Sequence, residues 1–301
     1  MDAFVKSSSS NGICTVEFFH PASNSLPGAI LAQIADAISS AGKNNDVRVI
    51  ILKSAGERAF CAGASFDELV AISNEEEGLQ FFSGFANVIN AIRQCPKFVL
   101  GRIQGNAVGG GVGIAAAVDH CFATKFASVK LSELAIGIGP FVVGPAVKRK
   151  LGTSGFAQLT IDATSWKDAT WAASYGLYSE VFETAVEMDT TIQELAEKLS
   201  KSSPEAMAEL KKVLWKGTED WNELDDGSVR IDILIFVHKL GQKKILIGTN
   251  GYNLKAVGSI VRKELELMMD KRVHIFLYVK VNRNWDNSPE YYKYLGLDFN
   301  V

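Results

Sequence analysis

The sequence has little of what a membrane or secreted protein needs. No apolar stretch reaches the roughly 18 uncharged residues of a membrane span. The first ten residues contain no basic segment followed by an apolar run, so we expect no signal peptide. The four cysteines, Cys14, Cys61, Cys95 and Cys121, form no CxxC pair and no Cys/His cluster. We therefore expect a cytoplasmic protein with buried free thiols, no metal site and no membrane partner.

Composition favours a folded chain in two parts. The 301 residues are more than one minimal domain needs, and 47% of them are hydrophobic, which is enough for a sizeable core. The net charge of -3 is unevenly divided. Residues 225–301 hold 12 basic and 9 acidic residues, whereas residues 1–224 hold 19 and 25. This change of sign suggests different partners for the two parts.

Strand-like and helix-like segments alternate through the first part of the chain. The predicted segments are strands at residues 12–19, 48–53 and 97–104 and helices at residues 27–41, 66–73, 78–94 and 111–119. Such alternation implies an α/β fold with a parallel sheet. The turn-forming residues Leu-Asp-Asp-Gly at 224–227 precede a new strand-like alternation at 228–237. We therefore predict two domains, 1–224 and 225–301.

Two glycine-containing loops interrupt this alternation. Gly109-Gly110-Gly111 follows a predicted strand and opens a predicted helix, and residues 60–64 have the same setting earlier in the chain. Backbone N–H groups at a helix N-terminus, with no side chain in the way, can stabilise a developing negative charge. Ala64 and Gly110 are the candidate donor pair. The alternative from spacing alone is that both loops are only tight turns.

Three motifs give these loops a family context. They are AGERAFCAGA at 55–64, QGNAVGGG at 104–111 and SELAIG at 132–137. In this order and spacing they resemble the crotonase (enoyl-CoA hydratase/isomerase) superfamily, over roughly residues 10–224. The resemblance implies a crotonase-like spiral of ββα units. It also implies acyl-CoA chemistry of fatty acid metabolism, either lyase or isomerase.

The resemblance also assigns site residues. Ala64 and Gly110 would supply the oxyanion-hole amides for a thioester carbonyl, and Glu133 matches one of the two glutamates that hydratases use as acid and base. No separate cofactor is implied, because coenzyme A is part of the thioester substrate. The residues expected along the coenzyme A path are Asn24, Ser25, Leu26, Ala62, Ser65, Phe66 and Asp67.

One position departs from the family pattern. Gly113 stands where the second glutamate is expected, two residues past the glycine triplet. Hydration of a double bond needs one carboxylate to orient water and another to deliver a proton, whereas one carboxylate suffices for isomerisation. Asp119 and Asp162 are the candidate replacements. Unless one of them serves, the sequence favours isomerase or decarboxylase chemistry over hydration.

The second part carries a different signature. Gly248-Thr249-Asn250-Gly251 lies between a strand and a helix, where a Gly-x-x-Gly loop either forms a plain turn or clamps an RNA backbone. Residues 227–299 resemble the C-terminal KH domain of Era-type GTPases, as a partial type II KH (α+β) segment without the first helix and strand of that domain. The implied RNA-binding residues are Lys244, Gly248, Thr249, Asn250, Gly251 and Lys255.

Two functions of different class follow. The first is an enoyl-CoA isomerase or hydratase with Glu133 as the acid/base. The alternative is an RNA-binding protein of the ribosome-assembly type with an inactive enzyme domain; the chain has no P-loop, so no GTPase activity is expected. The crotonase-like part lacks the C-terminal helices of that family, so we expect a truncated domain. Those helices build the family's trimer, so the sequence does not decide whether this chain forms a homotrimer or hexamer. Both resemblances lose material at one junction, which favours a joining of two reading frames or an assembly artefact over a natural fusion of two whole domains.

Overall fold

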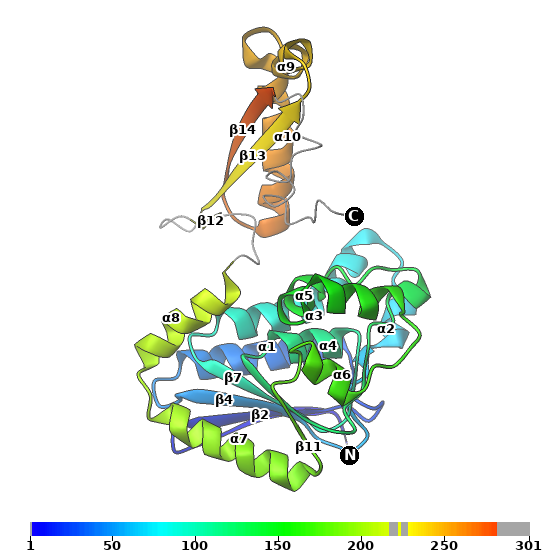
Figure 1. Cartoon of the computed structure of the whole chain (residues 1–301), viewed down its shortest axis with the longest axis vertical. Coiled ribbons are helices and arrows are strands. Elements are labelled where there is room, and N and C mark those ends of the chain that lie inside the picture. The colour runs from blue at the N-terminus through cyan, green and yellow to red at the C-terminus, as the bar shows by residue number, and fades with distance from the viewer. Residues whose placement is uncertain (1, 217–221, 224–227, 282–301) are drawn as a thin grey trace. The chain divides into compact units, whose positions relative to one another are not determined.

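A computed structural model describes residues 2–216, 222–223 and 228–281 (Figure 1). The chain divides into two compact units, Met1–Thr218 and Glu219–Val301. This division falls close to the predicted boundary between residues 224 and 225. The two units are therefore described separately.

A six-stranded sheet forms the centre of the first unit. Its order is β1 (Phe4–Ser10), β2 (Ile13–Phe19), β4 (Val49–Ser54), β7 (Phe98–Ile103), β9 (His120–Thr124) and β11 (Glu180–Phe182). The first two strands are antiparallel and every later pair is parallel. Helices α1 (Gly28–Lys43), α3 (Glu75–Gln94) and α4 (Gly110–Ala117) lie over one face, and α7 (Ala185–Ser200) lies over the other (Figure 1).

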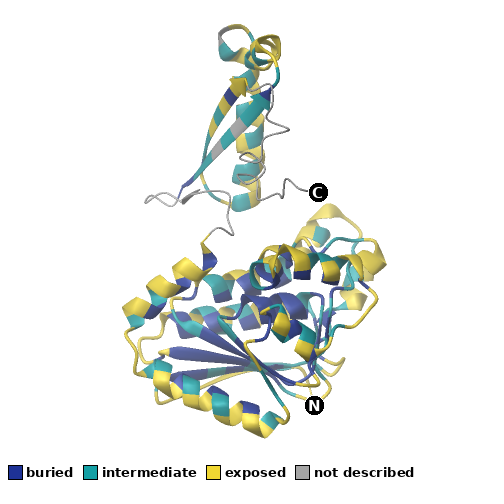
Figure 2. Cartoon of the chain, in the orientation of Figure 1, coloured by how far each residue is buried: buried dark blue, intermediate teal, exposed yellow. Residues whose placement is uncertain are grey.

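The two faces of this sheet are packed by alternate residues of the same strand. In β4, Val49 and Ile51 belong to a small cluster with Met188 of α7, whereas Ile50 and Leu52 belong to the large cluster on the opposite face. Burial on both faces explains why the strand is a continuous apolar run. Figure 2 shows most of the length of these central strands as buried.

The sequence did not predict strand β1, because its Ser7–Ser10 tract has neither β-branched nor aromatic residues. The strand pairs with β2 in full register from Phe4↔Phe19 to Ser10↔Ile13. Asn11 and Gly12 join the two strands with positive φ angles of 51° and 80°. An Asn-Gly pair with both residues at positive φ is the preferred two-residue hairpin turn. The Asn11-Gly12 dipeptide was therefore the feature of the sequence that could have predicted the hairpin of β1 and β2.

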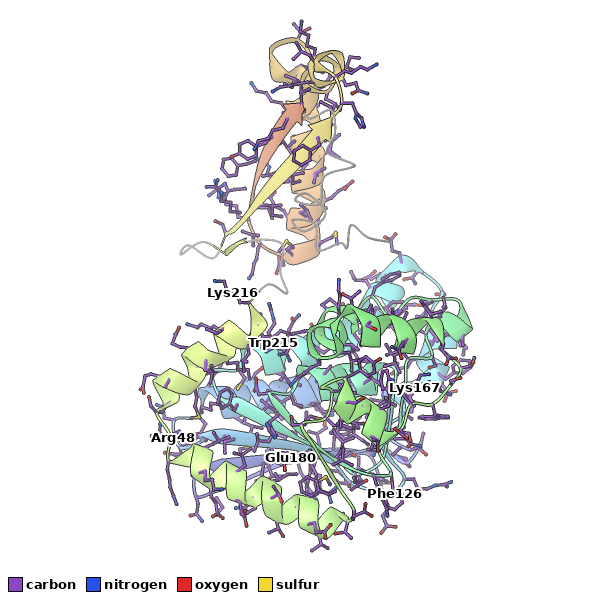
Figure 3. All side chains as sticks on the ribbon, in the orientation of Figure 1. Arg48, Phe126, Lys167, Glu180, Trp215 and Lys216 are labelled. Atoms are coloured by element: carbon purple, nitrogen blue, oxygen red, sulfur yellow. The ribbon has the colours of Figure 1, made fainter. Side chains whose placement is uncertain are left out.

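Smaller sheets and helices hold the loops of interest. Strands β3 (Ser25–Leu26) and β6 (Gly63–Ala64) pair in parallel, and β5 (Ala59–Cys61), β8 (Asn106–Val108) and β10 (Val129–Lys130) form a third sheet. The remaining helices are α2 (Phe66–Ala71), a 3-10 turn η1 (Leu134–Ile136), α5 (Gly144–Ile161), α6 (Ala169–Ser174) and α8 (Pro204–Trp215). Trp215 and Lys216 stand at the end of α8 (Figure 3).

The second unit has a three-stranded sheet with two helices. Strand β13 (Val229–Val237) lies between β12 (Asn222–Glu223), which is antiparallel to it, and β14 (Val273–Val281), which is parallel to it. Helix α9 (Leu240–Ile247), the turn η2 (Thr249–Gly251) and helix α10 (Tyr252–Met269) connect β13 to β14. The sequence indicated no strand before β13, so the two-residue β12 is an addition to the prediction.

Within the described residues, none of the helices combines the length and the apolar character that a membrane crossing requires.

A buried ion pair attaches α8 to the rest of the first unit. Lys211 Nζ lies 2.9 Å from Asp119 Oδ2, and the two side chains are 2% and 4% exposed. Lys211 also donates to the carbonyl of Lys97 at 2.8 Å, and Asp119 accepts from the N–H of Val99 at 2.7 Å. Lys211 Nζ and Asp119 Oδ2 therefore each have two polar partners that offset part of their loss of water, whereas Asp119 Oδ1 is buried with no hydrogen-bond partner among the described residues.

We predict that Lys211→Ala destabilises the first unit by about 3–5 kcal/mol, because it leaves the Asp119 carboxylate buried without its cation. The matched control is Lys212→Ala, which removes an exposed lysine that pairs with Glu209 one turn away on the same helix. Urea denaturation followed by circular dichroism measures both. Equal, small changes in the two variants would contradict the structural role given to the buried pair.

Candidate active site

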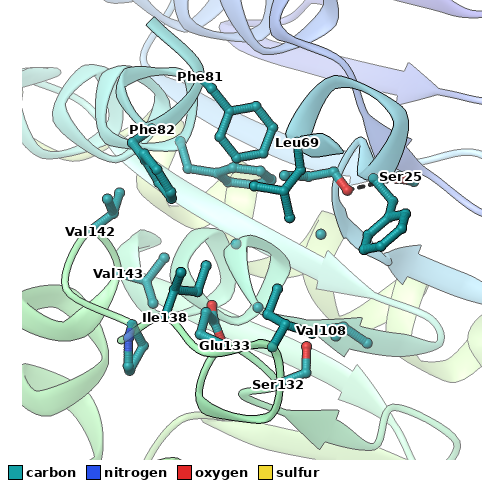
Figure 4. Close-up of a pocket in the computed structure, with 18 of the residues that line it drawn as sticks. Ser25, Leu69, Phe81, Phe82, Val108, Ser132, Glu133, Ile138, Val142 and Val143 are labelled. Carbon is teal, nitrogen blue, oxygen red and sulfur yellow. Dashed lines mark hydrogen bonds between the residues drawn. The ribbon is translucent and has the colours of Figure 1, made fainter. Parts of the chain in front are cut away.

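A cavity of about 310 Å³ lies in the first unit, bounded by the two glycine-containing loops. In Figure 4, Phe81 and Phe82 of α3 lie on one side of it, and Glu133 and Ser132 lie on the other. Most of the lining is apolar. The lining residues are Ser25, Ala62, Gly63, Ala64, Phe66, Leu69, Phe81, Phe82, Phe85, Val108, Gly109, Gly110, Ser132, Glu133, Ile136, Ile138, Gly139, Pro140, Val142 and Val143.

The predicted donor pair meets at this cavity. Ala64 ends β6, which is held beside β3 by pairing with Leu26 and by a hydrogen bond of 2.9 Å from Ser25 Oγ to the Ala64 carbonyl. Gly110 is the first residue of α4. Its N–H is one of the four at a helix start that have no acceptor within the helix. Residues from loops 46 positions apart in the sequence thus line one site.

The glycine triplet is required by close packing. Gly109 has φ 52° and ψ -117°, a conformation that L side chains rarely adopt. A Cβ on Gly110 would lie 2.4 Å from the ring of Phe85, and one on Gly111 would lie 2.5 Å from the carbonyl oxygen of Cys61. The helix start therefore approaches its neighbours through backbone alone.

Glu133 lines the same cavity, immediately before η1. Its Oε1 lies 3.1 Å from the point where a Cβ on Gly109 would stand, so the carboxylate is beside the glycine triplet. Its Oε2 is buried and has no hydrogen-bond partner among the described residues. Burial raises the pKa of Glu133 above its ordinary value, against a smaller opposite effect of its own backbone N–H.

The apolar residues near Glu133 in the sequence differ in their exposure. Leu131 is buried, whereas Leu134 and Ile136 are 53% and 51% exposed. Ile136 and Ile138 nevertheless line the cavity together with Glu133. The desolvation of the carboxylate therefore comes from the cavity wall, which includes these two isoleucines, and from the glycine loop beside it.

The structure separates the residues predicted for the coenzyme A path into two groups. Ser25, Ala62 and Phe66 line the cavity. Asn24 is buried outside it, where its Nδ2 donates to the carbonyls of Ala55 and Ala59 at 2.9 and 3.0 Å and its Oδ1 accepts from the N–H of His20 at 2.7 Å. Its side chain therefore holds the loop that leads into β5.

The other three path residues also lie outside the cavity lining. Leu26 is fully buried in the main core. Ser65 caps α2 by accepting from the N–H of Glu68 at 3.3 Å, and Asp67 is exposed in the first turn of that helix. Phe141, which follows the cavity residues Gly139 and Pro140, is 85% exposed and does not line the cavity.

No side chain from α4 supplies a second carboxylate. A Cβ on Gly113 would lie 2.5 Å from Val143 Cγ1 and 3.2 Å from Ile89 Cδ1, so neighbouring side chains fill that space. Of the candidate replacements, Asp119 pairs with Lys211 and Asp162 pairs with Lys167 at 3.0 Å. Glu133 is the one carboxylate among the described residues that line the cavity.

Several cavity residues were not singled out from the sequence, and three phenylalanines of α3 are the largest of them. Phe81, Phe82 and Phe85 of α3 line the cavity, yet they occur in a segment predicted only as a helix. Large apolar residues on a helix usually pack in the core, so their type gave no indication of a site. The available signal was the cluster of three phenylalanines within five residues.

The predicted RNA-binding residues lie around two hollows in the second unit. Gly248 and Gly251 have φ angles of 70° and 78°, and the intervening turn is η2. Lys244, Gly248 and Thr249 line one hollow. Gly251 and Lys255 line the other, together with Arg262 and His274, which the sequence analysis did not single out. The side chain of Asn250 lies outside the described part of the structure.

Gly113→Glu alone should destabilise the first unit by about 1–3 kcal/mol, because the new side chain overpacks against Val143 and Ile89. Combining it with Val143→Ala should recover part of that loss. Thermal unfolding of the single and double variants checks this. A single variant as stable as the unchanged protein would contradict the packing described here.

Comparison with known proteins supports both resemblances. The family model for enoyl-CoA hydratase/isomerase matches residues 8–255. A solved putative enoyl-CoA hydratase/isomerase (crotonase) from Legionella pneumophila is 22% identical with a TM-score of 0.66, covering 90% of this chain and 98% of that one. An enoyl-CoA hydratase from Mycobacterium smegmatis is 21% identical with a TM-score of 0.66, covering 89% and 97%. At these identities the likeness establishes the crotonase fold.

Among curated proteins, part of this chain is similar to a different protein, GTPase Era. GTPase Era of Brucella suis is 50% identical over 82 residues, and GTPase Era of Mesorhizobium japonicum is 46% identical over the same length. Each match covers 27% of this chain and 26% of the relative, so the chain spans about a quarter of the length of these curated relatives. This similarity is consistent with the predicted KH-like segment.

Proposed function

We propose that this chain, which belongs to the enoyl-CoA hydratase/isomerase family, moves a double bond in an enoyl-CoA thioester by way of an enolate. The observation that carries the proposal is that Ala64, Gly110 and Glu133 line one largely apolar cavity. The two backbone amides and one carboxylate are the groups that such a reaction needs.

In this proposal the thioester carbonyl oxygen accepts hydrogen bonds from the N–H groups of Ala64 and Gly110. When a proton leaves the carbon next to the carbonyl, negative charge develops on that oxygen. Fixed backbone donors stabilise it without reorganisation, and removing one such donor typically costs on the order of 10²–10³ in rate. The position of Gly110 at the start of α4 adds the favourable dipole of the helix.

Glu133 acts as the proton carrier. As a carboxylate it takes a proton from C2 of a 3-enoyl thioester, and the protonated acid returns that proton to C4 while the double bond moves to C2–C3. The carboxylate is restored, so one group completes the cycle. A raised pKa suits this alternation of base and acid. Hydration is disfavoured because no second cavity-lining carboxylate is present among the described residues.

Glu133→Gln should lower isomerisation of a 3-enoyl-CoA by about 10²–10⁴-fold, because the amide cannot carry the proton. Thioester affinity, measured by calorimetry, should change little. The matched control is Glu194→Gln, an exposed residue of α7 on the opposite face of the sheet, which should retain full turnover. Unchanged turnover in Glu133→Gln would remove Glu133 from the mechanism.

The pH dependence supplies an independent control on the same variant. The carboxylate form starts the reaction, so turnover should rise with pH through an ionisation above the ordinary value of 4.5. The raised pKa of Glu133 also affects the free energy of unfolding. Because the buried carboxylate is poorly solvated, the protein becomes less stable as the pH rises through this pKa. Glu133→Gln should therefore be at least as stable as the unchanged protein at neutral pH, which separates lost chemistry from lost fold.

A second candidate function concerns the second unit. We propose that it binds RNA through the loop between α9 and α10. The proposal is supported by the similarity to GTPase Era over 82 residues and by the basic residues Lys244, Lys255 and Arg262 around the two hollows. Glycines at both ends of the loop permit close approach of a phosphate backbone, which the lysines and the arginine attract.

The double variant Thr249→Asp, Asn250→Asp places two negative charges between these glycines, and we expect it to weaken binding of a labelled single-stranded RNA by roughly tenfold or more. The charge-matched control is Thr190→Asp, Gln193→Asp on the exposed side of α7. Fluorescence anisotropy on the full chain measures both. Equal affinity of the two variants would contradict the proposal, and acyl-CoA turnover should be unaffected in either.

A further inference from the structure

Helix α4 has no polar side chain with which to fix its own position. It is eight residues long, and every residue from Gly111 to Ala117 is buried. Glycine, alanine, valine and isoleucine pack on their neighbours but make no directional contact along the helix axis. Its N-terminal end faces the cavity. Polar contacts at its C-terminal end are therefore the ones that fix how far the helix extends toward the site.

Arg149 of α5 makes such a contact. Its Nη2 donates to the carbonyl of Ala116 at 2.8 Å, in the last turn of α4. The carbonyls of a last helical turn have no partner within the helix, so this hydrogen bond satisfies one of them. A cation at this end also interacts favourably with the helix dipole.

Arg149 is itself held by α8. Its Cζ lies 4.0 Å from the ring centre of Trp215, and its Nη1 donates to the carbonyl of Leu214 at 3.4 Å. Trp215 ends the helix and is buried (Figure 3). Burial lowers the pKa of Arg149, but a guanidinium remains protonated at neutral pH. The planar group is therefore fixed between the end of α8 and the end of α4.

Two further cations brace the residues that follow α4. Lys150 Nζ donates to the carbonyl of Asp119 at 3.1 Å, and Lys211 of α8 pairs with the Asp119 carboxylate. Of the three cations, Arg149 alone contacts the helix itself among the interactions described here. From Ala116 to Gly110 is about 9 Å along a rigid helix, so a shift at one end is transmitted to the other.

We propose that Arg149 is a positioning residue that sets the axial position of α4, and with it the position of the Gly110 amide, through its hydrogen bond to Ala116. This inference rests on the proposed oxyanion role of Gly110. It adds a residue that touches neither the cavity nor a bound thioester.

The test compares Arg149→Met, Arg149→Lys and the control Lys148→Met, an exposed residue one position earlier on α5. Methionine keeps apolar contact with Trp215 but cannot donate to Ala116. Because small misplacements of catalytic groups cost up to about 10²-fold in rate, we expect Arg149→Met to lower kcat by roughly 10- to 100-fold. KM should stay within about twofold, because the cavity wall is unchanged. Arg149→Lys should recover part of kcat.

A spectroscopic readout separates positioning from stability. An oxyanion hole polarises a bound conjugated aromatic enoyl thioester and shifts its absorbance to longer wavelength. Per molecule of bound ligand, Arg149→Met should show a smaller red shift than the unchanged protein and Lys148→Met should show the full shift. If Arg149→Met does not fold, Arg149→Lys takes its place in the test. We then expect Arg149→Lys to show a several-fold loss of kcat and a smaller red shift of the bound thioester than the unchanged protein.

The outcomes distinguish this inference from the proposed function. A full red shift and unchanged kcat in the folded Arg149 variants would overturn the positioning role while leaving the oxyanion hole in place. The absence of any red shift in the unchanged protein would remove the oxyanion hole itself, and this inference with it.

Discussion

The site depends on the packing of one short helix, α4, whose first two residues are glycines. Cβ atoms on Gly110 and Gly111 would collide with Phe85 and Cys61, so α4 approaches its neighbours through backbone alone. The core buries the helix from Gly111 to Ala117. The first residue of the helix, Gly110, lines the cavity, and its N–H has no acceptor within the helix. A backbone donor without a partner is also what an anionic intermediate requires.

Charge is distributed around this helix according to the same constraint. Cations lie at its C-terminal end, where Arg149 donates to the carbonyl of Ala116 and Lys150 donates to the carbonyl of Asp119. The carboxylate of Glu133 lies near the start of the helix. Glu133 has little compensation for its burial, which raises its pKa. Because the charged form of Glu133 is the poorly solvated one, the raised pKa implies a cost in folding stability as the pH rises through that pKa.

The sequence was a good guide where periodicity and glycine chemistry decide the structure. The buried run of β4 and the glycine triplet before α4 both appear as predicted. It failed for β1, where pairing with β2 overrides a serine tract, and for Phe81, Phe82 and Phe85, whose role depends on which face of α3 meets the cavity. The contacts of Arg149 with α4 and α8 join residues far apart in the chain, so no local pattern reveals them.

The central claim is that two main-chain amides polarise one thioester carbonyl. Isotope-edited infrared difference spectroscopy of an enoyl-CoA with a ¹³C-labelled carbonyl, bound to the Glu133→Gln variant so that no turnover occurs, measures this directly. The account predicts a carbonyl stretch at clearly lower frequency than that of the free thioester in water. A bound carbonyl that absorbs at the solution frequency would contradict it.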